Sequence, residues 1–199
     1  MHRNPGAQGE LFGAGLPEGL LYVPDFLGEA EEASLIAAIQ ALPLAEARYK
    51  QYTARRRIAS FGSQYDFGEN ELRPAAPLPD FLKPLRVKLS RWLSLPAEAF
   101  SDALVAEYRP GTPLGWHRDV PEFAVITGVS LGASCRMRFR PYPPGVSRAR
   151  NAFELCLEPR SAYVMRDEAR WRWQHAIPPT RGLRYSITFR TRSTRRSAA

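Results

Sequence analysis

Histidine is scarce in this chain, and two of its three histidines stand where they could bind a metal ion. His117 and Asp119 lie two residues apart, so in an extended segment their side chains project to the same side. His175 lies in a separate segment and could add a third ligand. Two imidazoles and one carboxylate form the facial triad of non-haem Fe(II) oxygenases, which leaves coordination positions open. A hydrogen-bonded turn histidine and a buried core histidine would also explain the pattern.

A second group of candidate residues lies on one predicted strand, residues 184–190. Alternation places four polar side chains on one face, Arg184, Ser186, Thr188 and Arg190, opposite Tyr185, Ile187 and Phe189. If the polar face lines the inside of a small barrel, its arginines need a carboxylate from the protein or from a ligand. A strand with a solvated outer face is the alternative interpretation.

The elements that must position these residues change from helix to strand along the chain. Apolar residues at three- and four-residue steps predict two amphipathic helices, over residues 28–42 and 80–93. After Pro96 the apolar period shortens towards two, which predicts about six strands, at 103–109, 125–131, 134–140, 153–157, 162–165 and 184–190. Helices followed by strands, without βαβ alternation, indicate an α+β protein whose helices back an antiparallel sandwich or barrel.

Length and composition fit one domain. The chain has 199 residues, of which 44% are hydrophobic, enough for one compact core. We expect a flexible leader rich in glycine and proline at 1–19, a single domain at 20–190 and a basic tail at 191–199. No apolar run of about 20 residues occurs, which argues against a membrane span. Two cysteines are too few for a disulfide scaffold, so we expect a cytoplasmic protein. We also expect it to be a monomer.

The positive charge of the chain is mostly arginine. There are 28 lysines and arginines against 20 acidic residues, a formal net charge of +8, and only Lys50, Lys83 and Lys88 are lysines. Because the guanidinium fork pairs with phosphate oxygens bidentately, this excess suits a nucleic-acid partner, although a solvated surface would also account for it. Three arginines alternate with apolar residues on one predicted strand: Arg136, Arg138 and Arg140. They could line a groove that binds the phosphates of a nucleic acid, or they could form a solvated strand face.

In their order along the chain, these motifs resemble the AlkB-like family of Fe(II)/2-oxoglutarate-dependent dioxygenases. The resemblance extends from about residue 20 to residue 190. It implies a double-stranded β-helix (jelly-roll) core with the N-terminal helices packed against it. The matching segments are Tyr108-Arg109-Pro110-Gly111, Gly115-Trp116-His117-Arg118-Asp119, Val129-Ser130-Leu131-Gly132 and the strand at 184–190.

The resemblance also implies cofactors and roles. His117, Asp119 and His175 would hold Fe(II) and leave room for O2. Arg184, assisted by Tyr108, would pair with the distal carboxylate of 2-oxoglutarate. Arg190 would lie nearer the iron-chelating end of this cosubstrate. Two positions near the cosubstrate depart from the family pattern, because Ala106 and Ser186 stand where asparagine is frequent.

Members of this family act on several substrates. The resemblance implies oxidative demethylation of N-alkylated bases in DNA or RNA, with release of formaldehyde, succinate and CO2. The alternatives are a 2-oxoglutarate oxygenase acting on a tRNA modification, a protein or a small molecule, and a non-catalytic nucleic-acid-binding module.

Aromatic and basic residues interleave in the N-terminal half, which suits a flipped or single-stranded base. Ordinary core or turn packing would explain the aromatic residues as well. Pro121 stands where many DNA-repair members have a second acidic residue, so base preference does not carry over from them. The candidate substrate-binding residues are Arg56, Arg57, Phe61, Tyr65, Trp116 and Glu122.

Overall fold

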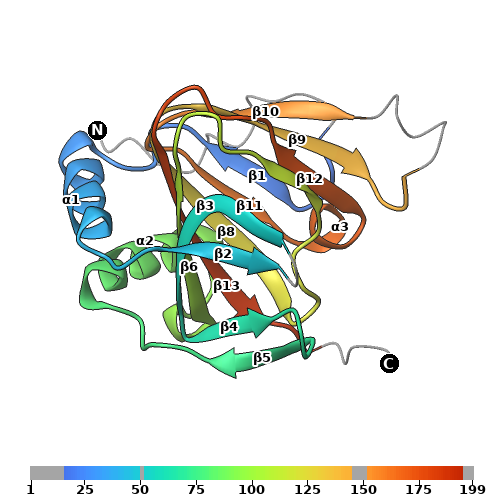
Figure 1. Ribbon diagram of the computed structural model, residues 1–199, viewed down its shortest axis with the longest axis horizontal. Helices are drawn as coiled ribbons and strands as arrows, with labels where there is room; N and C mark the ends of the chain where they lie inside the picture. The colour runs from blue at the N-terminus through green and yellow to red at the C-terminus, as the bar shows by residue number, and fades with distance from the viewer. Residues whose placement is uncertain (1–15, 50–51, 145–151, 195–199) are drawn as a thin grey trace, which may run out of the picture.

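Two antiparallel sheets face each other in the computed structural model, which describes residues 16–49, 52–144 and 152–194 (Figure 1). The larger sheet has seven strands and carries the helices on its outer face. Its strands, in spatial order, are β1 (Leu20–Val23), β11 (Ala162–Met165), β8 (Phe123–Gly132), β13 (Arg184–Arg192), β6 (Phe100–Tyr108), β3 (Tyr52–Phe61) and β2 (Ala45–Tyr49).

The smaller sheet has four strands and closes the other side of the core. In spatial order they are β10 (Phe153–Leu157), β9 (Cys135–Pro141), β12 (Trp173–Ile177) and β7 (Leu114–His117). A separate hairpin pairs β4 (Ser63–Asp66) with β5 (Glu71–Pro74), and the short helix α3 (Asp167–Trp171) precedes β12. Two facing antiparallel sheets with helices on one outer face confirm the predicted α+β jelly roll.

Two helices cover the larger sheet. Helix α1 (Glu29–Gln40) follows Gly28, whose backbone N–H donates to the Glu31 carboxylate. A 3₁₀ turn (Asp80–Leu82) leads directly into α2 (Lys83–Leu93), where Pro84 lies in the first turn and therefore breaks no helical hydrogen bond. The apolar faces of both helices pack on the sheet, so both predicted helices are confirmed.

Strand β13 runs through the middle of the larger sheet and separates two hydrophobic clusters. Its odd-numbered residues Tyr185, Ile187 and Phe189 belong to the cluster between the sheet and the helices. The second cluster lies between the two sheets and includes Met137, Phe139 and Tyr163. The even-numbered polar residues of β13 face this second side, where a cavity opens. The expected alternation on this strand is therefore confirmed.

The structure departs from the predicted elements in the N-terminal half, at β7, α3 and β12, which were not predicted, and at the C-terminal end of β13. Strands β1 to β5 occupy an N-terminal half for which only helices were predicted, because β1, β4 and β5 have four residues each and β3 is rich in arginine. Strand β13 continues to Arg192, into the expected tail, because the Arg192 guanidinium pairs with buried Asp102 at 2.8 Å. Residues 1–15 of the expected leader lie outside the described residues. Among the described residues, no helix is long and apolar enough to cross a membrane.

Candidate metal and cosubstrate site

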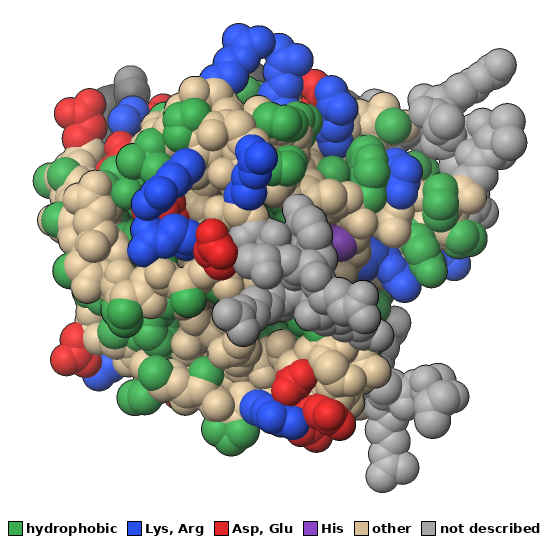
Figure 2. All heavy atoms as spheres, viewed as in Figure 1, with side chains coloured by type: hydrophobic (Ala, Val, Ile, Leu, Met, Phe, Trp, Pro, Cys, Tyr) green, Lys and Arg blue, Asp and Glu red, His purple; other side chains and the backbone are tan. Residues whose placement is uncertain are grey.

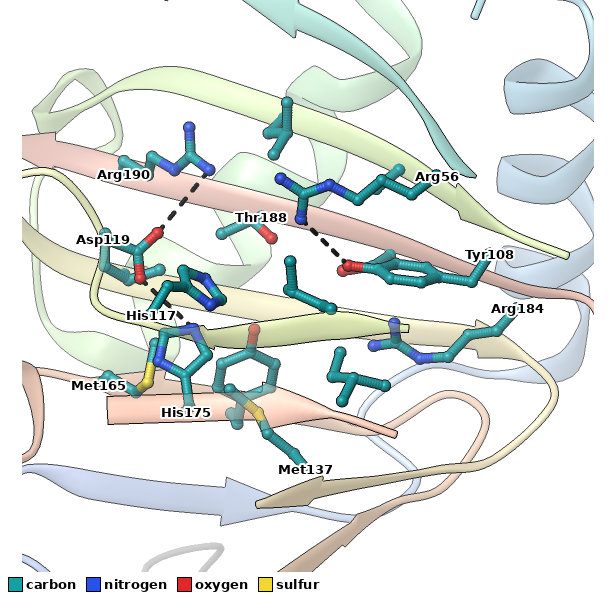
Figure 3. Close-up of a pocket in the computed structure, with 17 residues that line it drawn as sticks. Arg56, Tyr108, His117, Asp119, Met137, Met165, His175, Arg184, Thr188 and Arg190 are labelled. Atoms are coloured by element: carbon teal, nitrogen blue, oxygen red, sulfur yellow. Dashed lines mark hydrogen bonds and ion pairs between the residues drawn. The ribbon is translucent and has the colours of Figure 1, made fainter. Parts of the chain in front are cut away.

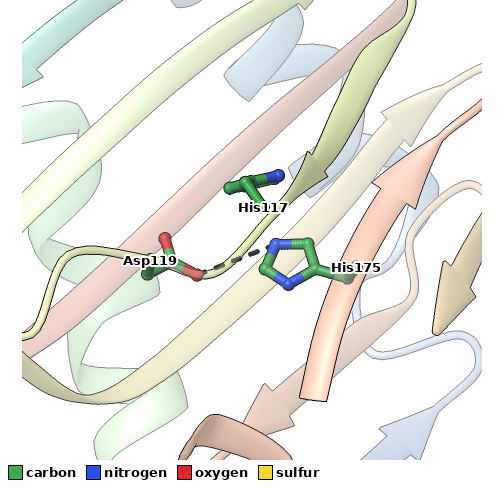
Figure 4. Close-up of side chains that lie close together, drawn as sticks. All are labelled: His117, Asp119 and His175. Atoms are coloured by element: carbon green, nitrogen blue, oxygen red, sulfur yellow. Dashed lines mark ion pairs between the residues drawn. The ribbon is translucent and has the colours of Figure 1, made fainter. Parts of the chain in front are cut away.

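Three candidate metal ligands meet at the edge of the smaller sheet (Figure 4). His117 ends β7 and lies directly opposite His175 of β12 in the strand register, so both rings point to the same side. Their ring centroids are 4.2 Å apart. Asp119 follows β7, and its carboxylate lies 3.7 Å from His175 Nε2. The three ligand atoms all lie within 4.8 Å of one another, so one metal ion could contact all three.

The protonation states of these residues suit a divalent cation. Burial lowers the pKa of His117, and burial together with the neighbouring His117 lowers the pKa of His175 to about 3, so both rings are neutral near pH 7. Burial raises the pKa of Asp119, but His175 when protonated and Arg190 outweigh it and hold that pKa below its usual range. His117 Nδ1–H donates to the Gly115 carbonyl at 2.9 Å, which leaves Nε2 with a free lone pair.

A buried arginine fixes the loop that carries Asp119. Arg170, on α3, is 3% exposed. Its Nη2 donates to the carbonyls of Asp119 at 3.1 Å and Val120 at 2.6 Å, and its Nε donates to the carbonyl of Phe123 at 3.1 Å. Sequence analysis missed this residue, because nothing in the local pattern predicts that α3 lies against that loop. The position of Asp119 therefore depends on a side chain some 50 residues further along the chain.

A cavity between the two sheets begins at these ligands and ends at Arg184 (Figure 3). Arg184 is 1% exposed, its Nε donates to Ser130 Oγ at 3.0 Å, and its guanidinium lies 5.1 Å from the centroid of the Tyr108 ring. Its Nη1 is buried and has no hydrogen-bond partner among the described residues. A buried guanidinium nitrogen without an acceptor is costly, so this end of the cavity fits a carboxylate ligand.

Two further arginines reach the same cavity. Arg190 Nη2 lies 3.9 Å from the Asp119 carboxylate, and Arg56, from β3, donates to the Tyr108 hydroxyl at 3.4 Å (Figure 3). Asp119 is the one acidic residue among the described side chains that line the cavity. The lining is therefore rich in hydrogen-bond donors, which suits an anionic ligand.

Tyr163 of β11 also lines the cavity, and sequence analysis missed it. It lies opposite Gly128 of β8, where a β-carbon would come within 2.6 Å of the tyrosine hydroxyl. Gly128 thus gives the ring its space. The signal that could have revealed this contact is a glycine inside an apolar strand, which often marks a close approach. Burial strongly raises the pKa of Tyr163, so its hydroxyl remains protonated.

The two positions where alanine and serine replace the family's frequent asparagine are neighbours in the structure. Ala106 of β6 and Ser186 of β13 are paired across the sheet, and both line the cavity. Both side chains are smaller than asparagine. The cavity wall is therefore wider here, and Ser186 offers one hydroxyl where an amide would offer two groups.

The structure separates the six candidate substrate residues. Arg56 lines the cavity, but alternation along β3 turns Arg57 and Phe61 to the other face of the sheet. Phe61 is 7% exposed within the cluster against the helices, and Arg57 pairs with Glu107 at 3.1 Å. These two side chains therefore lie outside the cavity lining, and their contact with substrate stays a prediction.

Tyr65, Trp116 and Glu122 lie outside the cavity lining. Tyr65 contacts Phe67 within the β4–β5 hairpin, and partial burial and the Glu122 carboxylate raise its pKa. Trp116 is 38% exposed and packs against Arg140. Of the three alternating arginines, Arg136 and Arg138 pair with Glu154 on an exposed strand face, which favours the solvated-face interpretation for these two.

A jelly roll that brings two neutral imidazoles and a carboxylate together beside an arginine-ended cavity defines a non-haem metal oxygenase with an anionic cosubstrate. Comparison with known proteins identifies the family. The chain belongs to the 2OG-Fe(II) oxygenase superfamily, whose model matches residues 19–190, and it is AlkB-like. Proteins of this family use Fe(II), 2-oxoglutarate and O2, and this chain is such a dioxygenase.

Similar proteins include an "Alkylated DNA repair protein ALKBH8 homolog" of Arabidopsis thaliana, 29% identical over 80% of this chain. The chain spans 51% of that relative's length. A "Probable RNA/DNA demethylase ALKBH6" of Danio rerio is 25% identical over 81% of this chain and 70% of its own length. The solved structure of OsALKBH1 superposes with a TM-score of 0.67 at 16% identity, covering 88% of this chain and 98% of the other.

Proposed function

We propose that this dioxygenase demethylates N-alkylated bases of DNA or RNA. The observation that carries the proposal is the cavity in which a histidine–aspartate cluster and the buried, partly unpartnered Arg184 stand at opposite ends. The names of the relatives, an alkylated-DNA repair protein homolog and a probable RNA/DNA demethylase, support a nucleic-acid substrate. The arginine-rich composition supports it further, because guanidinium groups bind phosphates.

In this proposal the donor set at one end of the cavity holds the iron. His117 Nε2, His175 Nε2 and the Asp119 carboxylate are the ligands, and the Gly115 carbonyl keeps His117 in the required tautomer. Bound there, Fe(II) supplies oxidation of a substrate C–H bond at the expense of O2 and 2-oxoglutarate. His117→Ala or Asp119→Ala is expected to abolish turnover, because two ligands do not fix the metal.

The other end of the cavity holds 2-oxoglutarate. The Arg184 guanidinium receives the distal carboxylate on the nitrogen that lacks an acceptor, while the Tyr108 ring packs against the same guanidinium. Ser186 adds a hydroxyl beside Arg184 on the same strand face. Arg190, near Asp119, lies towards the metal and attracts the chelating end of the cosubstrate.

The overall reaction balances without a further reductant. One 2-oxoglutarate and one O2 give succinate and CO2, and the remaining oxygen atom hydroxylates the N-methyl carbon. The resulting hemiaminal breaks its C–N bond, returns a proton to the base nitrogen and releases formaldehyde. The protein binds and orients the base for the first step, and Arg56 reaches the cavity from the side opposite the smaller sheet, where a base could contact it (Figure 3).

Succinate formation tests the proposal directly. The protein is incubated under air with Fe(II), 2-oxoglutarate and either a methylated oligonucleotide or its unmethylated twin. Methylation-dependent succinate together with formaldehyde is the expected result. Turnover that ignores methylation redirects the search to a protein or small-molecule substrate. No turnover with any substrate supports a nucleic-acid-binding module instead.

A second candidate function is hydroxylation of a modified tRNA base without demethylation. Relatives named tRNA (carboxymethyluridine(34)-5-O)-methyltransferase ALKBH8 favour it, for example that of Mus musculus, which is 27% identical over 82% of this chain. This chain covers only 25% of that protein. Hydroxylation of a carbon that is bonded to neither nitrogen nor oxygen gives a stable alcohol, so succinate without formaldehyde on a tRNA substrate would identify this function.

A further inference from the structure

The strand that carries His117 has a second, outward-facing side. Because neighbouring residues of a strand point to opposite faces, Trp116 and Arg118 project outward on either side of the inward-pointing His117. Both are exposed. Together with outward residues of β9, β12 and the segment after β9 they form the Arg–aromatic surface: Trp116, Arg118, Arg140, Tyr142 and Gln174.

Two stacked arginine–aromatic pairs organise this surface. The Arg140 guanidinium lies 4.3 Å from the centroid of the Trp116 ring, and its Nε donates to Gln174 at 2.9 Å. The Arg118 guanidinium lies 3.7 Å from the centroid of the Tyr142 ring, and its Nη1 donates to a backbone carbonyl at 3.1 Å. Both aromatic rings remain more than a third exposed. The pairs hold both cations in place before any ligand arrives, so less side-chain entropy is lost on binding.

The described residues leave the two arginines of this surface without a carboxylate partner. Within the part of the chain that the structure describes, neither Arg118 nor Arg140 has a carboxylate within 4 Å. Arg136 and Arg138, on the same strand face as Arg140, do have one, because both pair with Glu154 at 3.6 Å and 2.6 Å. Figure 2 shows basic and hydrophobic side chains next to one another at the right of the molecule, with a histidine at the surface beside them.

We propose that the Arg–aromatic surface docks a single-stranded nucleic acid next to the base that enters the cavity. Guanidinium groups with free donors suit phosphates, and exposed aromatic faces suit unpaired bases, whose faces a duplex hides. The surface is also close to the metal, since Arg118 lies between two ligands in the chain. This inference rests on the proposed function.

Binding of a labelled oligonucleotide tests the surface. The probe is a fluorescent single strand of about 12 nucleotides with one N-methylated base, followed by anisotropy with the Mn(II)-loaded full chain at several salt concentrations. Arg118→Ala and Arg140→Ala are each expected to weaken binding several-fold. Each should also reduce the slope of log K against log salt by about 0.7, the value for one phosphate contact on a single strand.

Arg91→Ala is the matched control, because Arg91 is an exposed arginine on α2 and its loss changes the net charge equally. Its binding and slope should equal those of the wild type. Mn(II) affinity and melting temperature are measured for each variant, since Arg118 adjoins two metal ligands. If Arg118→Ala no longer binds Mn(II), the surface is tested with Arg140→Ala and with Arg140→Lys, which keeps the positive charge. Arg140→Lys should keep the salt slope but bind less tightly than the wild type.

The outcomes separate the two proposals. If the wild type binds and demethylates the strand, and Arg118→Ala and Arg140→Ala keep its affinity and salt slope, the surface inference is wrong and the proposed function stands. If a duplex binds more tightly than the single strand, the assignment to single strands is wrong. If the wild type neither binds nor demethylates any methylated oligonucleotide, the proposed function fails and the docking inference fails with it.

Discussion

Replacing Arg170 with methionine should weaken metal binding without touching a ligand. The guanidinium of Arg170 holds three carbonyls of the loop from Asp119 to Phe123. Each hydrogen bond from a charged donor contributes about 1.5–3 kcal/mol, but some of the freed carbonyls would be rehydrated near the metal site. We therefore expect Arg170→Met to lower the free energy of unfolding by about 3–5 kcal/mol, less than the sum of the three bonds.

The effect on the metal follows from the position of the loop. Because Asp119 lies on the segment that Arg170 holds, its carboxylate would lose its fixed orientation. Loss of a residue that orients a ligand typically costs about 10–100-fold in metal affinity. The assay is Mn(II) binding followed by electron paramagnetic resonance, together with urea unfolding of the same samples.

Arg172→Met provides the matched control. Arg172 lies two residues further along, and within the described chain its side chain makes no hydrogen bond or ion pair. The control should bind Mn(II) as the wild type does. A folded Arg170→Met protein that keeps wild-type Mn(II) affinity would refute the idea that this arginine positions Asp119.

Three further predictions concern the cavity and its ligands. Arg184→Met should raise KM for 2-oxoglutarate by at least about 30-fold, because it removes the buried charge at the end of the cavity, and steady-state kinetics with an unchanged KM would contradict this. Gly128→Ala should lower the melting temperature and 2-oxoglutarate affinity, since the new β-carbon would lie 2.6 Å from the Tyr163 hydroxyl; wild-type values of both would exclude the clash. In the metal-free protein, the pKa of His175 is lowered from 6.5 to about 3, so the unfolded chain binds more protons below pH 6.5. Stability is then complete above about pH 6.5 and falls on acidification, by up to about 1.4 kcal/mol per pH unit. Urea midpoints should depend less steeply on pH in His175→Gln, and an equal dependence would exclude this origin.

The periodicity of apolar residues was sufficient to predict those strands and helices that are buried on one side. Strand β13 alternates between the helix-facing cluster and the cavity, so its two faces could be assigned from the sequence. The same reasoning failed for β3. Its arginines hide the apolar alternation that packs Phe61 against the helices. Composition indicated a nucleic-acid contact there, whereas the sheet turns every second residue away from the cavity.

The ligand set could be predicted because its residues are rare and closely spaced, but the residues that support it could not. Arg170 and Tyr163 reach the site from distant segments, and their roles depend on where α3 and β11 lie. One of the chain's many arginines cannot be singled out by residue type. Gly128 was visible as a glycine within an apolar strand, yet only the register shows that it faces Tyr163.

Strand β7 links the metal site to the proposed nucleic-acid-binding surface, because its successive side chains point to opposite faces. His117 points inward to the metal, while Trp116 and Arg118 point outward, so a shift of this strand would move both faces together. Among the described strands, β7 lies at the edge of the smaller sheet and pairs only with β12. A nucleic acid that bound Arg118 and Tyr142 would therefore displace the segment that joins His117 to Asp119. Oligonucleotide binding should then change the Mn(II) spectrum of the wild type, and Arg140→Ala, which leaves β7 itself intact, should reduce that change in proportion to the bound fraction. A spectrum unaffected by saturating oligonucleotide would show that the two faces of β7 act independently.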